Sequence, residues 1–279
     1  ATVTVSGGTS PYNYSWNNGQ TTATAYGLFP EIQSVNVFDA NGCLASNNVT
    51  ITQPQQLSAT TSVSNVTCNA GSNGSVNLTV SGGTSPYSYT WSNAGTTEDV
   101  TGLIAGTYTV TVTDSCNASV VVSSGITQPG SLSLSEIISD VKCNGANNGS
   151  VNLSVSGGVT PYTYNWSNNV TTQDISNLSP ATYIVTVTDA CAKTSTDTAV
   201  VNQPATLTTG ISKINVSCNG SGDGAATATP SGGTSPFTYN WNNGQTTQTA
   251  VGLFPGNYSV NVVDANGCLA TGLVTITQP

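Results

Sequence analysis

Apolar and polar residues alternate in short runs along the whole chain, which is the pattern of half-buried β-strands. In the runs Val76–Val80 and Tyr108–Val112, every second side chain is apolar or aromatic, and Asn or Thr lies between them. Clusters rich in Gly, Ser and Pro, such as Ser81–Pro86, separate the runs. No stretch has the periodicity of a helix, so the pattern predicts an all-β protein with short strands.

The pattern returns every 75 residues, a step shared by four tryptophans and four Gln-Pro dipeptides: Trp16, Trp91, Trp166 and Trp241, with Gln53, Gln128, Gln203 and Gln278. A fixed period of this length indicates tandem copies of one small domain. We predict complete copies at residues 55–129, 130–204 and 205–279. Residues 1–54 match a copy without about its first 21 positions, so we expect the chain to be a piece of a longer polypeptide.

One copy contains about seven short runs with turn residues between them, which is typical of an immunoglobulin-like antiparallel β-sandwich. In the second copy we expect strands at residues 57–64, 76–80, 87–91, 97–100, 108–113, 119–122 and 126–127. Only Gly130 and Ser131 separate Pro129 from the apolar run at Leu132. Because proline restricts the backbone and no long flexible linker follows, we expect the tandem sandwiches to form an extended rod.

Charged residues are scarce, and this excludes several classes of function. The chain has three Lys, no Arg and no His, twelve carboxylates and a net charge of −9. Such a chain cannot neutralise phosphates, so we expect no nucleic-acid partner and no direct insertion into, or adsorption on, an anionic membrane. Without histidine or a phosphate-binding loop, we also expect no catalytic residues, no cofactor and no enzyme activity.

The seven cysteines follow the repeat. Each complete copy has one early and one late cysteine, separated by 48, 48 and 50 residues, and Cys43 is the late cysteine of the first copy. A zinc site needs closer Cys or His spacing. One pair in each copy is typical of an oxidised, exported protein. We predict the disulfides Cys68–Cys116, Cys143–Cys191 and Cys218–Cys268.

Two further sets of residues recur in every copy. Asp39, Asp114, Asp189 and Asp264 precede the late cysteines. We interpret them as turn residues; calcium ligation is the weaker alternative, because few other carboxylates lie nearby. The run Tyr87–Trp91 places three rings on one strand face, and we expect Trp16, Trp91, Trp166 and Trp241 to be core residues; a sugar-binding platform is the alternative.

The recurring blocks resemble a known family. They are Cys218–Gly224, Ser81–Trp91, Gly102–Asp114 and the Ile-Thr-Gln-Pro ends. Together they are similar to the SprB repeat of giant surface adhesins from gliding bacteria of the Bacteroidetes. The resemblance covers the whole chain and implies type IX secretion and display on the bacterial cell surface. It also implies O-glycosylation at Thr198, within Asp197-Thr198-Ala199; an exposed turn is the alternative.

The sequence therefore predicts a non-enzymatic, extracellular stalk of a bacterial adhesin that projects a binding region for attachment or gliding. Its expected partners are the neighbouring repeats of the same polypeptide. The alternatives are a subunit of a self-assembling filament or sheath, with identical chains as partners, a carbohydrate-binding array with surface glycans as partners, and a spacer attached to a secreted hydrolase.

Overall fold

The computed structural model describes residues 1–279 and contains twenty-one strands and no helix, which confirms the all-β prediction. The first repeat contains β1 (Asn13–Trp16), β2 (Ile32–Phe38) and β3 (Leu44–Thr50). The second contains β4 (Ser58–Ser64), β5 (Gly74–Ser81), β6 (Ser88–Trp91), β7 (Val100–Leu103), β8 (Gly106–Thr113) and β9 (Ser119–Ile126). The third contains β10 (Ser133–Ser139), β11 (Gly149–Ser156), β12 (Thr163–Trp166), β13 (Ile175–Leu178), β14 (Ala181–Thr188) and β15 (Thr194–Val201). The fourth contains β16 (Thr208–Ile214), β17 (Gly224–Ser231), β18 (Thr238–Trp241), β19 (Thr249–Leu253), β20 (Gly256–Val263) and β21 (Leu269–Ile276).

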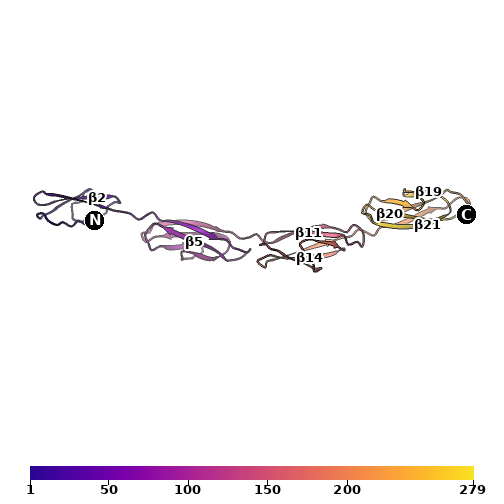
Figure 1. The fold of residues 1–279 in the computed structure, drawn as a ribbon, viewed down its shortest axis with the longest axis horizontal. Helices are drawn as coiled ribbons and strands as arrows, with labels where there is room; N and C mark the ends of the chain where they lie inside the picture. The colour runs from indigo at the N-terminus through magenta and orange to yellow at the C-terminus, as the bar shows by residue number, and fades with distance from the viewer. The chain divides into compact units, whose positions relative to one another are not determined.

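Each complete repeat is a sandwich of two three-stranded antiparallel sheets. In the fourth repeat the sheets have the orders β16-β17-β19 and β18-β20-β21. Strand β16 of one sheet packs against β21 of the other, and Figure 1 shows β19 in one layer with β20 and β21 in the other. The second and third repeats repeat these orders, and no sheet takes strands from two repeats. This confirms the prediction of small antiparallel sandwiches.

The chain divides into two compact units. One consists of Ala1–Asn65 and Ser72–Thr127, and the other of Val66–Gly71 and Gln128–Pro279. The third and fourth repeats therefore lie in the second unit, together with a short loop that belongs by sequence to the second repeat.

The core of each sandwich comes from the alternating positions that the sequence pattern marks. In the fourth repeat Trp241, Val260 and Val262 of one sheet cluster with Ala226 and Ala228 of the other. All five are at most 1% exposed. The polar residues between them point outward, so the period of two in the sequence becomes one buried and one solvated face.

The structure differs from the predicted strand list in two places. The last two predicted strands of a copy are one strand, β9, because Gly125 does not interrupt its pairing with β8. The short run expected at residues 97–100 is displaced to β7, and Gly102 within it has a φ of 70°. A complete copy therefore has six strands rather than about seven.

The first repeat keeps only one of the two sheets, with the order β1-β2-β3. In place of the other sheet, residues 1–6 form a single antiparallel bridge, between Thr2 and Thr24. Trp16 still packs with Val35 and Val37. Every residue of β3 is exposed.

Candidate functional site

The loop that carries the early cysteine lies at the end of the repeat from which the chain leaves. In the third repeat, Cys143 is in the loop between β10 and β11. The backbone N–H of Gly145 donates to Oε1 of Gln203 at 2.9 Å, and Nδ2 of Asn144 donates to the carbonyl of Pro204 at 3.0 Å. These bonds hold the cysteine loop beside the Gln-Pro dipeptide that ends the repeat.

The turn that carries the late cysteine lies at the opposite end, where the chain enters the repeat. In the fourth repeat, Oδ1 of Asp264 accepts the N–H of Cys268 at 2.8 Å, and Oδ2 accepts the N–H of Thr234 at 2.8 Å. The neighbouring Gly233 donates its N–H to the carbonyl of Ala205 at 3.0 Å. The turn is thereby fixed beside the first residues of its own repeat.

Two disulfides join successive repeats at these ends. Cys143 of the third repeat bonds to Cys268 of the fourth, with 5.6 Å between their Cα atoms. Beside this disulfide, Nδ2 of Asn266 donates to the carbonyl of Lys142 at 3.1 Å. In the same way Cys68, in the loop Val66–Gly71, bonds to Cys191 of the third repeat.

The predicted pairings Cys68–Cys116, Cys143–Cys191 and Cys218–Cys268 are therefore wrong. The two cysteines of one repeat lie at opposite ends of the sandwich, and a strand such as β21 has eight residues, which corresponds to about 26 Å. A disulfide needs Cα atoms within about 7 Å. Cys43, Cys116 and Cys218 are free and exposed.

The residues that hold the loop were not among the predicted site residues, although their signal is in the repeat. Cys-Asn recurs near the start of each complete copy and Gln-Pro at its end. In the structure, hydrogen bonds join the two motifs. The N–H of Ala70 donates to Oε1 of Gln128 at 3.0 Å, and Nδ2 of Asn69 donates to the carbonyl of Pro129 at 2.9 Å. Pairing these motifs would have placed the early cysteine at the end from which the chain leaves.

The four recurrent aspartates act as turn residues. In each turn Oδ1 accepts the N–H of the cysteine that follows, at distances of 2.9, 2.9, 2.8 and 2.8 Å in Asp39, Asp114, Asp189 and Asp264. For Asp39 the N–H of Cys43 is the largest cause that lowers the carboxyl pKa. For the other three, burial raises the pKa but the backbone N–H groups outweigh it, so the pKa is lowered. No group of three or more His, Cys, Asp or Glu that could hold a metal gathers in the structure, so nothing in these turns adds to the calcium alternative.

The tryptophans are inside the sandwiches. Trp16, Trp91, Trp166 and Trp241 are 4, 3, 2 and 1% exposed. In each complete repeat the indole N–H donates to a backbone carbonyl, for example from Trp241 to Thr247 at 3.0 Å. The tyrosines on the same strand are half-buried. The aromatic run therefore presents no flat exposed platform of the kind that stacks on a sugar ring.

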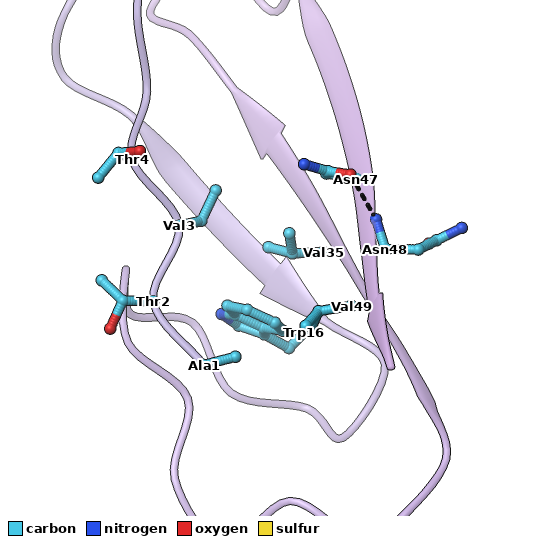
Figure 2. Close-up of a pocket in the computed structure, with 9 residues that line it drawn as sticks. All are labelled: Ala1, Thr2, Val3, Thr4, Trp16, Val35, Asn47, Asn48 and Val49. Carbon is cyan, nitrogen blue, oxygen red and sulfur yellow. Dashed lines mark hydrogen bonds between the residues drawn. The ribbon is translucent and has the colours of Figure 1, made fainter. Parts of the chain in front are cut away.

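The first repeat has a groove where a complete repeat has its first strand. Residues 1–4 line one side of a groove of about 240 Å³, and Asn47, Asn48 and Val49 of β3 line the other. Figure 2 shows the ring of Trp16 at the floor, beside Val35. In the fourth repeat the equivalent edge of β21 is covered by β16.

Thr198 lies in strand β15 and is exposed, so the alternative of a turn at this position is wrong. Its backbone N–H donates to Oδ1 of Asp197 at 2.8 Å. O-glycosylation of Thr198 remains a prediction.

Comparison with known proteins fits the repeat pattern. The SprB repeat family matches four segments of the chain, at residues 1–21, 60–96, 135–171 and 211–246. The chain carries SprB repeats. Each match to a complete repeat contains the second strand of the repeat, the Gly-Gly turn and the strand that ends at the tryptophan. The SprB repeat is of the cell-surface adhesin type, and the inter-repeat disulfides are those of a protein exposed to an oxidising compartment.

No curated protein matches the sequence. Among solved structures, the chain is similar to immunoglobulin domains 1–5 of Sidekick-1, with 10% identity, a TM-score of 0.40 and coverage of 96% of this chain and 74% of that one. It is also similar to a Dscam isoform, with 9% identity, a TM-score of 0.28 and coverage of 96% and 91%. The structure contains no helix that is long and apolar enough to cross a membrane.

Proposed function

We propose that this SprB array is a non-enzymatic stalk of a large bacterial surface adhesin. It is exported by the type IX route and projects a distal binding region for attachment or gliding. The observation that supports this proposal best is the joint between repeats. At the joint of the third and fourth repeats, the peptide bond between Pro204 and Ala205 and the disulfide Cys143–Cys268 connect the same two domains.

A joint with two covalent connections suits a protein that bears tension. A pull along the chain at this joint is shared between the backbone and the disulfide, and the bond from Gly145 to Gln203 holds the disulfide loop in place. One connection alone would leave the next domain free to rotate about the short linker. The disulfide restricts this rotation, as a stalk requires.

The distribution of ionisable groups supports a structural role. The recurrent carboxylates accept backbone N–H groups in turns, where their lowered pKa keeps them charged and unsuited to proton transfer near neutral pH. The rings that would bind a glycan are in or beside the core. The chain thus offers length and repeated joints rather than a reactive centre.

Small-angle X-ray scattering of the oxidised chain tests this proposal. If the four repeats form an extended rod, we expect a maximum dimension on the order of 150 Å, from strands that rise about 3.3 Å per residue. The double variant C143S/C268S is the matched control, and we expect it to show greater flexibility with the same domains folded. A compact particle in the oxidised chain would rule out the stalk.

A filament subunit is a second candidate, favoured by the open groove of the first repeat and by its exposed β3. Unpaired strand edges promote association between chains. Sedimentation velocity at increasing concentration separates the two candidates. Assembly that disappears when β3 carries a lysine, in Asn47→Lys, would support the filament, and a monomer at every concentration would support the stalk.

A further inference from the structure

The loop of Cys218 shares two hydrogen bonds with the two loops whose cysteines are bonded. In the bonded loops, the N–H two positions after the cysteine donates to the repeat's terminal glutamine, at 3.0 Å from Ala70 and 2.9 Å from Gly145. In the fourth repeat Gly220 donates to Oε1 of Gln278 at 3.2 Å. The N–H of Ser221 also donates to the carbonyl of Cys218 at 3.0 Å, as Gly71 and Ala146 do to Cys68 and Cys143. The loop is therefore already formed around a free, exposed thiol.

The turn that such a loop bonds is also formed without its partner. In the bonded turn of the fourth repeat, Nδ2 of Asn266 donates to Oγ1 of Thr234 at 2.9 Å. In the first repeat, whose Cys43 is free, Nδ2 of Asn41 donates to Oγ1 of Thr9 at 3.0 Å. The bond from the cysteine N–H to the aspartate is likewise the same in both. Both halves therefore have these hydrogen bonds before they are joined, which lowers the conformational cost of bonding.

The two observed disulfides follow one rule: the loop cysteine of a repeat bonds to the turn cysteine of the next. Under this rule the free cysteines are those whose counterpart is not in the 279 residues. Cys218 is a loop cysteine without a following turn, and Cys43 and Cys116 are turn cysteines without a preceding loop. No free cysteine breaks the rule.

From this geometry we propose that Cys218 is a covalent docking site for the turn cysteine of an adjoining SprB repeat. Formation of the bond removes two electrons and two protons from two thiols. A low-molecular-weight disulfide, such as glutathione disulfide, accepts them in two exchange steps. The Cys218 thiolate first displaces one glutathione thiolate, and the turn cysteine then attacks the mixed disulfide at the Cys218 sulfur and releases the second. Cys218 cannot close on its own Cys268, which is at the other end of the repeat and already bonded.

The test supplies the missing partner to the full chain. Residues 130–204 are appended once more after Pro279, so that the number of cysteines rises from seven to nine and Cys218 stays in a peptide that occurs only once. The chain is refolded with glutathione disulfide, its free thiols are alkylated, and its linked peptides are identified by mass spectrometry. We expect Cys218 to be linked to the turn cysteine of the appended repeat, with three thiols left free, as in the original chain.

Two matched variants show whether Cys218 forms the new disulfide. In C218S the appended turn cysteine should be fully alkylated, whereas C116S should keep the new linkage and lose one free thiol. A second extension uses residues 205–279, whose turn is two residues longer. It should likewise leave three free thiols, which would show that the result does not depend on the folding of one fusion. Fully alkylated Cys218 in the first extended chain together with five free thiols in the second, or linkage of Cys218 to any cysteine other than the appended turn cysteine, would overturn the proposal.

Discussion

The first and fourth repeats share most of their sequence, but the first repeat lacks the segment that forms β16 and has one sheet instead of two, and the difference shows what that segment contributes. Residues 1–54 correspond to residues 226–279 at a constant offset, with identical Asp-Ala-Asn-Gly-Cys turns. The fourth repeat has β16, which pairs with β17 and packs against β21. As a result β21 alternates between buried and exposed positions, whereas the equivalent β3 is exposed throughout.

The remainder of the first repeat is formed in spite of this loss. Trp16 is buried with Val35 and Val37, and the Asp39 turn has its full set of hydrogen bonds. The sheet that carries the tryptophan is therefore locally determined. The first strand closes the second layer and covers the edge of the last strand.

Truncation of the tryptophans should have the largest effect on the free energy of unfolding, and this effect should differ between the two repeats. Trp241→Ala leaves a cavity in a closed core, and such changes cost about 3–5 kcal/mol. Trp16→Ala should cost less, because the vacated space opens onto the groove and fills with water. Chemical unfolding followed by fluorescence of the remaining tryptophans measures both. Equal losses would show that the groove does not weaken the first core.

Restoration of the first strand should stabilise the first repeat. The fusion places residues 55–75 before Ala1 and adds the equivalents of Leu57 and Val66, which are 8 and 3% exposed in their own repeat. Full burial of such a side chain contributes about 1.5–3 kcal/mol, offset in part by ordering of the added residues. Hydrogen exchange of the β3 amides is the measurement, and slower exchange is expected.

A matched graft of residues 205–225 should fit less well. A Cβ on Gly272 would lie 2.5 Å from Cδ1 of Ile211, and the first repeat has Asn47 at the position of Gly272. The graft would therefore bring an isoleucine against an asparagine. Equal protection of β3 by both grafts would show that this contact is not selective.

Gln33 accounts for a smaller part of the difference between the two repeats. It takes the place of Tyr258, and both donate to an equivalent carbonyl, Gln33 to Phe29 at 3.1 Å and Tyr258 to Phe254 at 3.0 Å. Oε1 of Gln33 is buried without a partner, which costs about 1–3 kcal/mol. Gln33→Tyr should raise the unfolding free energy of the first repeat by a similar amount. Gln33→Glu is the control and should lower it.

The smallest expected effect on stability comes from the contact between the first and last strands of the third repeat, β10 and β15. There Glu136 and Asp197 take the positions of Ile211 and Gly272. The hydrogen bond to Asp197, with burial and the charge of Asp197, raises the pKa of Glu136. A raised pKa stabilises the folded state below the unfolded value of about 4.3 and loses this stabilisation as pH rises through the folded value.

Glu136→Gln should therefore raise the melting temperature at pH 7 and leave it nearly unchanged at pH 4. The turn aspartates act in the opposite direction. Because their pKa values are lowered, their contribution to the stability of the folded state is lost as pH falls. If Glu136→Gln raised the melting temperature equally at both pH values, the carboxyl pair would not be the cause of the change.

Local pattern was enough to predict the strands and the core. The alternation of Val76, Leu78 and Val80 predicted β5, and all four tryptophans are in fact buried. The disulfides could not be predicted in this way, because the separations within a repeat and the separations of 123 and 125 between repeats are equally regular. Only the three-dimensional positions of the two loops, at opposite ends of the sandwich, decide between them.

The central claim is that covalent bonds run between repeats and not within them. Peptide mapping of the oxidised 279-residue chain without reduction tests it most directly. We expect linked peptides that contain Cys68 with Cys191 and Cys143 with Cys268, and alkylated Cys43, Cys116 and Cys218. Linked peptides that contain Cys68 with Cys116, or Cys143 with Cys191, would contradict it.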